Sequence, residues 1–354
     1  MSSSNLIDVV ALGASTPVGR SAWASAAAVR AGISGFVEHP FMLDSAGAPM
    51  RAAIAPWLDV GLGGLGRFKA LLFPAIDQAL APLQGASGAQ PRIALSLGLP
   101  APRPGLEDDL PRALDHALRQ DYGRAFSALA VFPAGHAAGL LALEAAFHSL
   151  QKGGFDACVV AGVDSYIEPE TLEWLESEEQ LHSAGELNNA WGFIPGEAAG
   201  AVLLVRRELA ERLGMPALAR VLSVGTGYER KRIKTETVCI GEGLTAAFRT
   251  ALQGLPKGFQ VSDVYCDMNG EPYRADEYGF TVLRTKEAFV SASDFVAPAD
   301  CWGDVAAAGG PLHLMLATIA GTKRYAKGPL AFAWASSEDG RRCAALLAVD
   351  TLGH

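Results

Sequence analysis

Continuous apolar runs recur along the first half of the chain, and each run ends at a turn that contains Gly or Pro. Runs of this kind are typical of strands that are buried on both faces. Apolar residues that recur every three or four positions instead predict a helix. The pattern predicts one helix that ends near Gly32 and another from Ala137 to about Lys152. It predicts strands at residues 9–12, 92–100, 127–135, 156–165 and 192–207. Strands and helices in this order predict a layered α/β fold.

The same order of elements restarts after a polar segment at residues 206–216. The later part predicts five further elements in order. They are a strand and turn at residues 217–227, a helix at 243–255, a strand ending in a polar loop at 261–272, a helix at 309–322 and a hairpin at 328–349. The order of elements resembles that of the first half, although the residues do not. We therefore expect a pseudo-duplicated fold, with an N-terminal half at residues 1–205 and a C-terminal half at residues 217–354.

Composition and charge exclude several classes of protein. Half of the 354 residues are apolar and 19% are charged, as in an ordinary globular chain. The net charge is −9, and basic residues gather only in a short run at residues 228–234. A solvated loop accounts for such a run, so nucleic acid is not an expected partner. The five cysteines show no C-x-x-C spacing, which argues against a disulfide framework and a structural zinc site.

The N-terminal segment and the longest uncharged run bear on localisation. The first residues contain no basic region, and Asp8 interrupts their apolar run, so we expect no signal peptide and a reducing cytoplasm. Residues 125–143 form a run without Asp, Glu, Lys or Arg, and this run is long enough to suggest a membrane span. Pro133, Gly135 and Gly139 interrupt the run. A buried strand, turn and helix explain it better, and no membrane span is expected.

Three stretches of the first half carry a resemblance to a known family. They are "VVALGASTPVGRSAWASAAAVRAGISG" at 9–35, "HAAGLLALEAAFHSLQKGGFDACVVAGVDS" at 136–165 and "AWGFIPGEAAGAVLLV" at 190–205. Together they resemble the β-ketoacyl synthases of the thiolase-fold superfamily. The second half resembles these enzymes more loosely, in "YCDMNGEPYRADE", "CWGDVAAAGGPLHLMLA" and "SSEDGRRCAALL". The resemblance implies a five-layer αβαβα fold made of two pseudo-duplicated halves, usually in a homodimer.

The residues that carry the family's chemistry are replaced in this sequence. Family enzymes place a Cys at the N-terminus of the buried helix and use two His residues to decarboxylate a malonyl unit. The Cys position falls on His136. The first His position falls on Asn269, with Glu271 where the family has Thr, and the second falls on Asp304. The resemblance therefore implies that standard Claisen condensation is not expected.

His136 has three interpretations at this position. The helix dipole disfavours a cation at the N-terminus, so we expect a neutral imidazole that acts as a base or a hydrogen-bond partner. With Asp304 it would form a carboxylate–histidine dyad that activates water. With Glu271 and Asp304 it would form a metal set of two carboxylates and one histidine. Alternatively, it fills the space of the Cys and its acyl chain, and Asn269, Glu271 and Asp304 form turns or line a relic pocket.

The sequence leaves three functions open. The first is a binding, scaffold or accessory protein that keeps the fold without the chemistry. The second is an acyl-thioester hydrolase, decarboxylase or acyltransferase that uses His136 as base. The third is a subunit similar to a chain-length factor, which works with an active synthase. Expected partners are a second copy of the chain, an acyl carrier protein, acyl-coenzyme A, a synthase subunit or a component of a secretion gene cluster.

Other residues are expected to have structural roles. The turn at residues 13–19 lacks the middle glycine of a dinucleotide fingerprint, so no cofactor is expected. Glu197 is expected to be buried and hydrogen-bonded in the core. Cys266 and Cys301 are expected to pack in a strand or loop.

Overall fold

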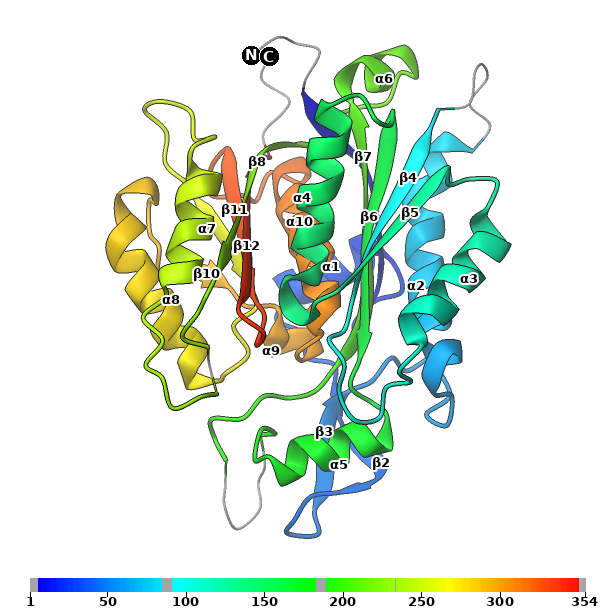
Figure 1. Cartoon of the computed structure of the whole chain (residues 1–354), viewed down its shortest axis with the longest axis vertical. Coiled ribbons are helices and arrows are strands. Elements are labelled where there is room, and N and C mark those ends of the chain that lie inside the picture. The colour runs from blue at the N-terminus through cyan, green and yellow to red at the C-terminus, as the bar shows by residue number, and fades with distance from the viewer. Residues whose placement is uncertain (1–5, 85–90, 183–188, 233, 350–354) are drawn as a thin grey trace.

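The structure is a computed structural model that describes residues 6–84, 91–182, 189–232 and 234–349. Its main feature is a ten-stranded sheet to which both halves of the chain contribute (Figure 1). The first half contributes β1 (Ile7–Ser15), β4 (Ile93–Leu99), β5 (Ala128–Pro133), β6 (Ala157–Ser165) and β7 (Glu197–Arg206). The second half contributes β8 (Ala219–Tyr228), β9 (Asp263–Cys266), β10 (Phe295–Val296), β11 (Leu330–Ser336) and β12 (Arg341–Ala348). The expected absence of a signal peptide rests partly on residues 1–5, which lie outside the described residues.

The two halves of the sheet have the same topology. Outward from the centre, the strand order is β1-β7-β6-β4-β5 in one direction and β8-β12-β11-β9-β10 in the other. In each half the inner two pairings are antiparallel and the outer two are parallel. The halves join where β1 pairs with β8 at residues 7–9. The expected pseudo-duplication is therefore confirmed, whereas the boundaries at residues 1–205 and 217–354 stay a prediction.

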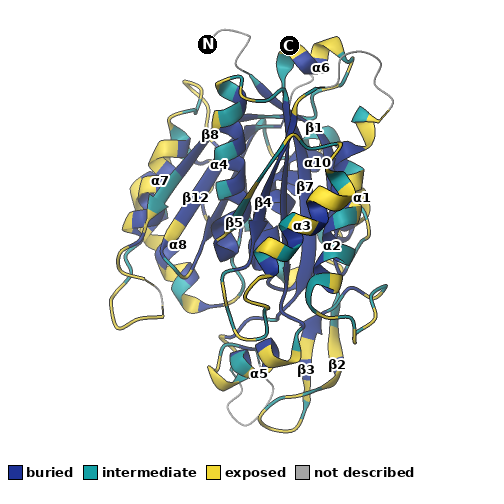
Figure 2. Cartoon of the chain, turned by 45° about the vertical axis from the view of Figure 1, so that its right-hand side comes forward, coloured by how far each residue is buried: buried dark blue, intermediate teal, exposed yellow. Residues whose placement is uncertain are grey.

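Helices cover the sheet and separate its halves, which gives five layers (Figure 1). The central layer holds α1 (Ala22–Arg30), α4 (Ala138–Gln151) and α10 (Gly309–Thr322). One outer layer holds α2 (Gly64–Leu80) and α3 (Leu110–Tyr122), and the other holds α7 (Glu242–Leu252) and α8 (Pro272–Thr285). Figure 2 shows exposed residues on α3, α7 and α8 and buried strands between the layers. In α10 every residue from Gly309 to Ala320 is buried, as expected of a helix that is apolar on all sides.

Helices α4 and α10 approach each other closely at two glycines. A Cβ atom at Gly139 would lie 2.3 Å from Pro311 Cδ, and one at Gly310 would lie 2.7 Å from the Leu140 backbone nitrogen. Both separations are far below van der Waals contact, so only residues without a Cβ atom permit this packing. A 3₁₀ turn precedes each helix, η3 (Gly135–Ala137) before α4 and η5 (Ala306–Ala308) before α10. These two turns contact each other and bring together the loops in which the candidate residues lie.

Several segments differ from the prediction. The polar segment at 206–216 contains a short helix, α6 (Arg207–Arg212), and the strand predicted at 192–207 begins only at Glu197. In the stretch at 261–272 the strand ends at Cys266, and the polar loop predicted to follow it leads into α8. Several further elements were not predicted: η2 (Ala81–Leu83), η4 (Lys286–Ala288), α2, α3, α5 (Pro169–Ser177), α8, α9 (Ala299–Trp302), and the separate hairpin of β2 (Phe36–Leu43) and β3 (Pro49–Ala53).

The uncharged run at residues 125–143 folds as a strand, a turn and a helix. It contains β5, η3 and the start of α4, as the sequence predicts. Across the described ranges, no helix combines the length and the apolar character that a membrane crossing requires.

Candidate active site

His136 lies in the turn that connects β5 to α4, at the carboxyl end of a parallel strand. Gly135 opens this turn with φ +67°, a left-handed conformation that favours glycine. The imidazole is buried, and one face of it lines a cavity. The sequence prediction that a histidine occupies the N-terminus of the buried central helix is thus confirmed, with a 3₁₀ turn before the α-helix proper.

Asp304 contacts His136 with both carboxylate oxygens. The Oδ1 and Oδ2 atoms lie 3.0 and 2.9 Å from His136 Nε2. Asp304 also accepts hydrogen bonds from the Ala306 backbone N–H (2.8 Å) and from Asn269 Nδ2 (2.6 Å). Burial alone would raise the pKa of Asp304, but His136, Arg274 and these hydrogen bonds hold it well below its usual range. The carboxylate is therefore ionised and fully hydrogen-bonded.

Asn269 and Glu271 extend this network toward α8. Asn269 Nδ2 also donates to Glu271 Oε2 (2.8 Å), and the Glu271 backbone N–H donates to Asn269 Oδ1 (3.1 Å). Tyr273 donates its hydroxyl hydrogen to Glu271 Oε2 at 2.6 Å. The structure thus joins His136, Asp304, Asn269 and Glu271 in one network. Their proximity agrees with the resemblance, and a catalytic role for them stays a prediction.

Arg274 is the main residue of the site that sequence analysis missed. Its side chain is fully buried, and Nη2 lies 3.0 Å from His136 Nε2. The guanidinium also donates to Glu271 Oε2 (3.3 Å), Asp267 Oδ2 (2.8 Å) and the Ser336 carbonyl oxygen (3.0 Å). Burial opposes the cation, but the surrounding negative charges raise the pKa of Arg274 well above its usual range. The only signal in the sequence is its position three residues after Glu271 at the start of α8.

The position of Arg274 limits what His136 can do. A ring nitrogen either donates a hydrogen or accepts one, yet His136 Nε2 faces an acceptor, Asp304, and a donor, Arg274. Whether it donates to Asp304 or accepts from Arg274, Nε2 is engaged with the interior network. Among the described residues, the group whose ligand atoms converge closely enough to hold one ion does not include His136, Glu271 and Asp304, so the geometry does not support the metal set considered from sequence.

The Ser337 side chain forms hydrogen bonds with backbone groups in the turn that begins the central helix. Its hydroxyl accepts a hydrogen bond from the Ala137 backbone N–H (2.8 Å) and donates to the Ala134 carbonyl oxygen (2.5 Å). The first N–H groups of a helix have no partner within the helix and can otherwise bind an anion. Ser337 satisfies one of these donors, which leaves that donor unavailable to an oxyanion.

The cavity next to His136 is small. Its volume is about 80 Å³, and Arg103, Tyr166, Phe193, Glu271 and Glu338 are among the residues that line it. Sites for drug-sized ligands usually enclose about 300–1,000 Å³. Arg103, which was also not predicted, is held by Asp164 Oδ1 at 2.6 Å and lies over the Tyr166 ring. The cavity can hold a few water molecules, and it has no room for a long acyl chain.

Lys234 bridges three residues that line this cavity. Its ammonium group lies 3.2 Å from Glu271 Oε1, donates to Gln180 Oε1 at 2.6 Å, and forms an ion pair with Glu338. All three partners line the cavity and come from different segments of the chain. Lys234 therefore connects the lining of the cavity to the network around His136.

Glu197, Cys266 and Cys301 are buried; Cys266 lies in strand β9 as expected, whereas Cys301 lies in the short helix α9 rather than in a strand or loop. Glu197 is buried, and it accepts hydrogen bonds from Arg67 Nε (2.5 Å) and the Ala55 backbone N–H (2.8 Å). Cys266 and Cys301 are both buried. Burial raises the pKa of both thiols, which makes neither a strong nucleophile at neutral pH.

Comparisons of sequence find the resemblance in one part of the chain. Residues 130–210 match the family described as Beta-ketoacyl synthase, N-terminal domain. A polyketide synthase of Burkholderia thailandensis, ThaQ, is 40% identical over 82 residues. That match covers 22% of this chain and 4% of the much longer synthase.

Comparisons of structure extend over nearly the whole chain. A chain from a type II polyketide synthase acyl-carrier protein in complex with its ketosynthase aligns with a TM-score of 0.79 at 14% identity, covering 97% of this chain and 99% of that one. The ishigamide ketosynthase/chain length factor aligns with a TM-score of 0.71 at 20% identity, over 97% and 99% of the two chains. A Streptomyces albus oxazolomycin ketosynthase domain aligns with a TM-score of 0.73 at 15% identity, over 99% and 76%.

These likenesses agree with the topology of the sheet and with the position of His136 at the start of the central helix. Over nearly its whole length the chain has the fold of these ketosynthase structures, and residues 130–210 resemble the β-ketoacyl synthase N-terminal domain in sequence.

Proposed function

We propose that this protein does not catalyse Claisen condensation and acts as a binding or accessory protein with a ketosynthase fold. The observation that carries the proposal is the contact of 3.0 Å between Arg274 Nη2 and His136 Nε2. Condensation requires a nucleophile that accepts an acyl group from a thioester. A thiolate at a helix N-terminus does this well, whereas this imidazole is held between Asp304 and a buried guanidinium.

The cavity supports the same proposal. A volume of about 80 Å³ beside His136 is small for an acyl chain. The ion pairs of Lys234 with Glu271 and Glu338 hold two lining residues of the cavity together. An acyl carrier protein or acyl-coenzyme A would bind productively only if these contacts opened.

The edge of the sheet suggests how the protein binds a partner. β5 is the outermost strand of the first half, and its sequence ALAVFP contains no charged residue. An apolar edge strand exposes unpaired backbone groups and tends to pair with another strand. We propose that β5 pairs with β5 of a second copy of this chain, and that a synthase subunit is the alternative partner. The chain-length-factor neighbour supports this alternative only through its fold.

A cytoplasmic location belongs to the same proposal. All five cysteines are free thiols, as a reducing compartment would keep them.

A second candidate function rests on the pair of His136 and Asp304. His136 Nε2 lies 2.9 Å from the carboxylate of Asp304. The other ring nitrogen, Nδ1, would then be the base that activates a water molecule in the cavity. The function would be hydrolysis or decarboxylation of a small acyl thioester.

Thioester turnover distinguishes the two candidates. The purified protein is incubated with malonyl- and acetyl-coenzyme A, and free thiol is followed between pH 6 and pH 9, next to His136→Ala and the surface variant His148→Ala. We expect no release above the uncatalysed rate in any of the three. Release that His136→Ala abolishes and His148→Ala keeps would support the hydrolase and overturn the accessory role.

A further inference from the structure

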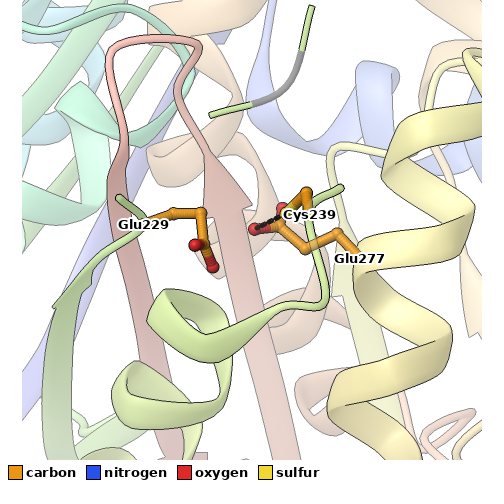
Figure 3. Close-up of side chains that lie close together, drawn as sticks. All are labelled: Glu229, Cys239 and Glu277. Carbon is orange, nitrogen blue, oxygen red and sulfur yellow. Dashed lines mark hydrogen bonds between the residues drawn. The ribbon is translucent and has the colours of Figure 1, made fainter. Parts of the chain in front are cut away.

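A second group of buried ionisable side chains lies away from His136, where the end of β8 meets α8. Glu229 directly follows β8, Cys239 lies in the loop before α7, and Glu277 lies in α8 (Figure 3). One ligand atom from each, a sulfur and two carboxylate oxygens, lie within 4.8 Å of one another. Because the three residues are far apart in sequence, the spacing of the cysteines alone did not reveal this group.

Glu229 is a buried carboxylate without a cationic partner. Only 1% of the residue is exposed. Its oxygens accept hydrogen bonds from two backbone N–H groups, those of Lys231 (3.1 Å) and Gly243 (2.8 Å). Within the part of the chain that the structure describes, no Lys, Arg or His side chain forms an ion pair with it. A buried carboxylate without a counter-charge is costly, so a cation at this place would stabilise it.

Glu277 has one occupied and one free oxygen. It is fully buried, and its Oε1 accepts a hydrogen bond from Arg342 Nε at 2.6 Å. Its Oε2 has no hydrogen-bond partner among the described residues. Arg342 fixes the orientation of this carboxylate toward Cys239, whose Sγ lies 3.7 Å from Oε1 (Figure 3). In metal sites such outer partners orient the ligands in the same way as Arg342 and the two backbone N–H groups do here.

We propose that Glu229, Cys239 and Glu277 bind one divalent cation of the zinc type. A thiolate with two carboxylates is a ligand set that suits zinc, which takes sulfur and oxygen ligands in a tetrahedron. Three protein ligands leave the fourth position to water. On binding, the Cys239 thiol releases its proton to solvent and the sulfur forms a bond to the metal. The charges of the site then sum to zero, because the divalent ion and the Arg342 guanidinium balance the two carboxylates and the thiolate.

The ion would fasten the loop between β8 and α7 to α8. This loop carries Lys234, which contacts Glu271 and Glu338 in the lining of the cavity. The proposed site is thus a structural clasp that holds the lining of the cavity in place. It does not depend on whether the protein hydrolyses thioesters.

Cobalt spectroscopy tests the site directly. The protein is freed of metal with a chelator, checked by circular dichroism, and titrated with Co²⁺ and then with Zn²⁺. We expect one equivalent of Co²⁺ per chain, a thiolate-to-cobalt charge-transfer band, and displacement by Zn²⁺. Cys239→Ser should abolish the band, and Glu229→Gln should weaken Zn²⁺ binding by about tenfold or more.

Two control variants match these substitutions. Cys301→Ser removes a buried thiol outside the cluster, and Glu236→Gln removes a carboxylate from the exposed part of the same loop. Both should bind Co²⁺ and Zn²⁺ as the wild type does. Absence of the band in folded wild-type protein, or its persistence in Cys239→Ser, would overturn the proposal.

Discussion

Arg274 Nη2 lies 3.0 Å from His136 Nε2, in a buried network at the start of the central helix α4. The guanidinium comes from the first turn of α8, and the imidazole comes from the turn before α4. Asp304 approaches the same ring nitrogen at 2.9 Å. The centre of the site is therefore a packed network of charges, in which each ion stabilises its neighbours.

Removal of the Arg274 side chain should destabilise the protein strongly. Arg274→Ala leaves Asp267 and Glu271 buried without their main counter-charge, and breaking a buried ion pair in this way typically costs about 3–5 kcal/mol. Denaturant unfolding measures the change. As a control, Arg341→Ala removes a half-exposed partner of Asp339, for which about 0–1 kcal/mol is expected. Similar losses in the two variants would contradict the structural role of Arg274.

The stability of the protein should fall as the pH drops below about 4, and less steeply in Asp304→Asn. Burial tends to raise the pKa of Asp304, but His136 and Arg274 hold it well below the ordinary value of 3.8. The unfolded chain therefore binds a proton at this carboxyl before the folded chain does. The stabilisation is complete above the unfolded pKa and is lost as the pH falls through the folded pKa.

Urea unfolding at pH 7 and pH 3 measures this difference between Asp304→Asn and the wild type. Asp115→Asn, on the outer surface of α3 beside Arg119, serves as a control and should keep the wild-type pH dependence. If Asp304→Asn lost as much stability as the wild type between pH 7 and pH 3, the shifted pKa of Asp304 would be excluded as the source of that loss.

Two glycine substitutions should have effects of opposite sign. Gly139→Ala places a Cβ atom 2.3 Å from Pro311 Cδ between the central helices, and such overpacking typically costs about 1–3 kcal/mol. Gly279 lies in α8 with open space around its would-be Cβ atom. Gly279→Ala should stabilise the protein by about 0.4–1 kcal/mol. Thermal unfolding of both variants tests the prediction, and a neutral Gly139→Ala would argue against close contact of α4 and α10.

A charge on the edge strand should prevent dimer formation. Val131→Lys introduces a cation into the apolar edge of β5, which disfavours pairing with another strand. Analytical ultracentrifugation should show a dimer for the wild type and a monomer for Val131→Lys. Val290→Lys, at a residue that is 67% exposed away from this edge, should remain a dimer. A wild-type monomer would refute the proposed pairing.

Local patterns determined much of the fold from the sequence alone. Continuous apolar runs predicted β4 and β6, and the run at 309–322 predicted α10 to the residue. The resemblance placed His136, Asn269, Glu271 and Asp304 at one site, and the structure joins them by hydrogen bonds. Amphipathic helices such as α3 and α8 were missed because their polar residues dilute the apolar pattern.

Only the tertiary structure decided which charged side chains are buried and which partners surround them. Arg274 is fully buried because Glu271, Asp267, Ser336 and His136 converge on it from separate segments. Likewise, Glu229, Cys239 and Glu277 meet only when the segment between β8 and α7 lies against α8. Hydrophobic periodicity acts between residues close in sequence, so the sequence determines elements and layers. The free energy of a buried charge depends on partners that the fold brings from far along the chain, so no local pattern can determine it.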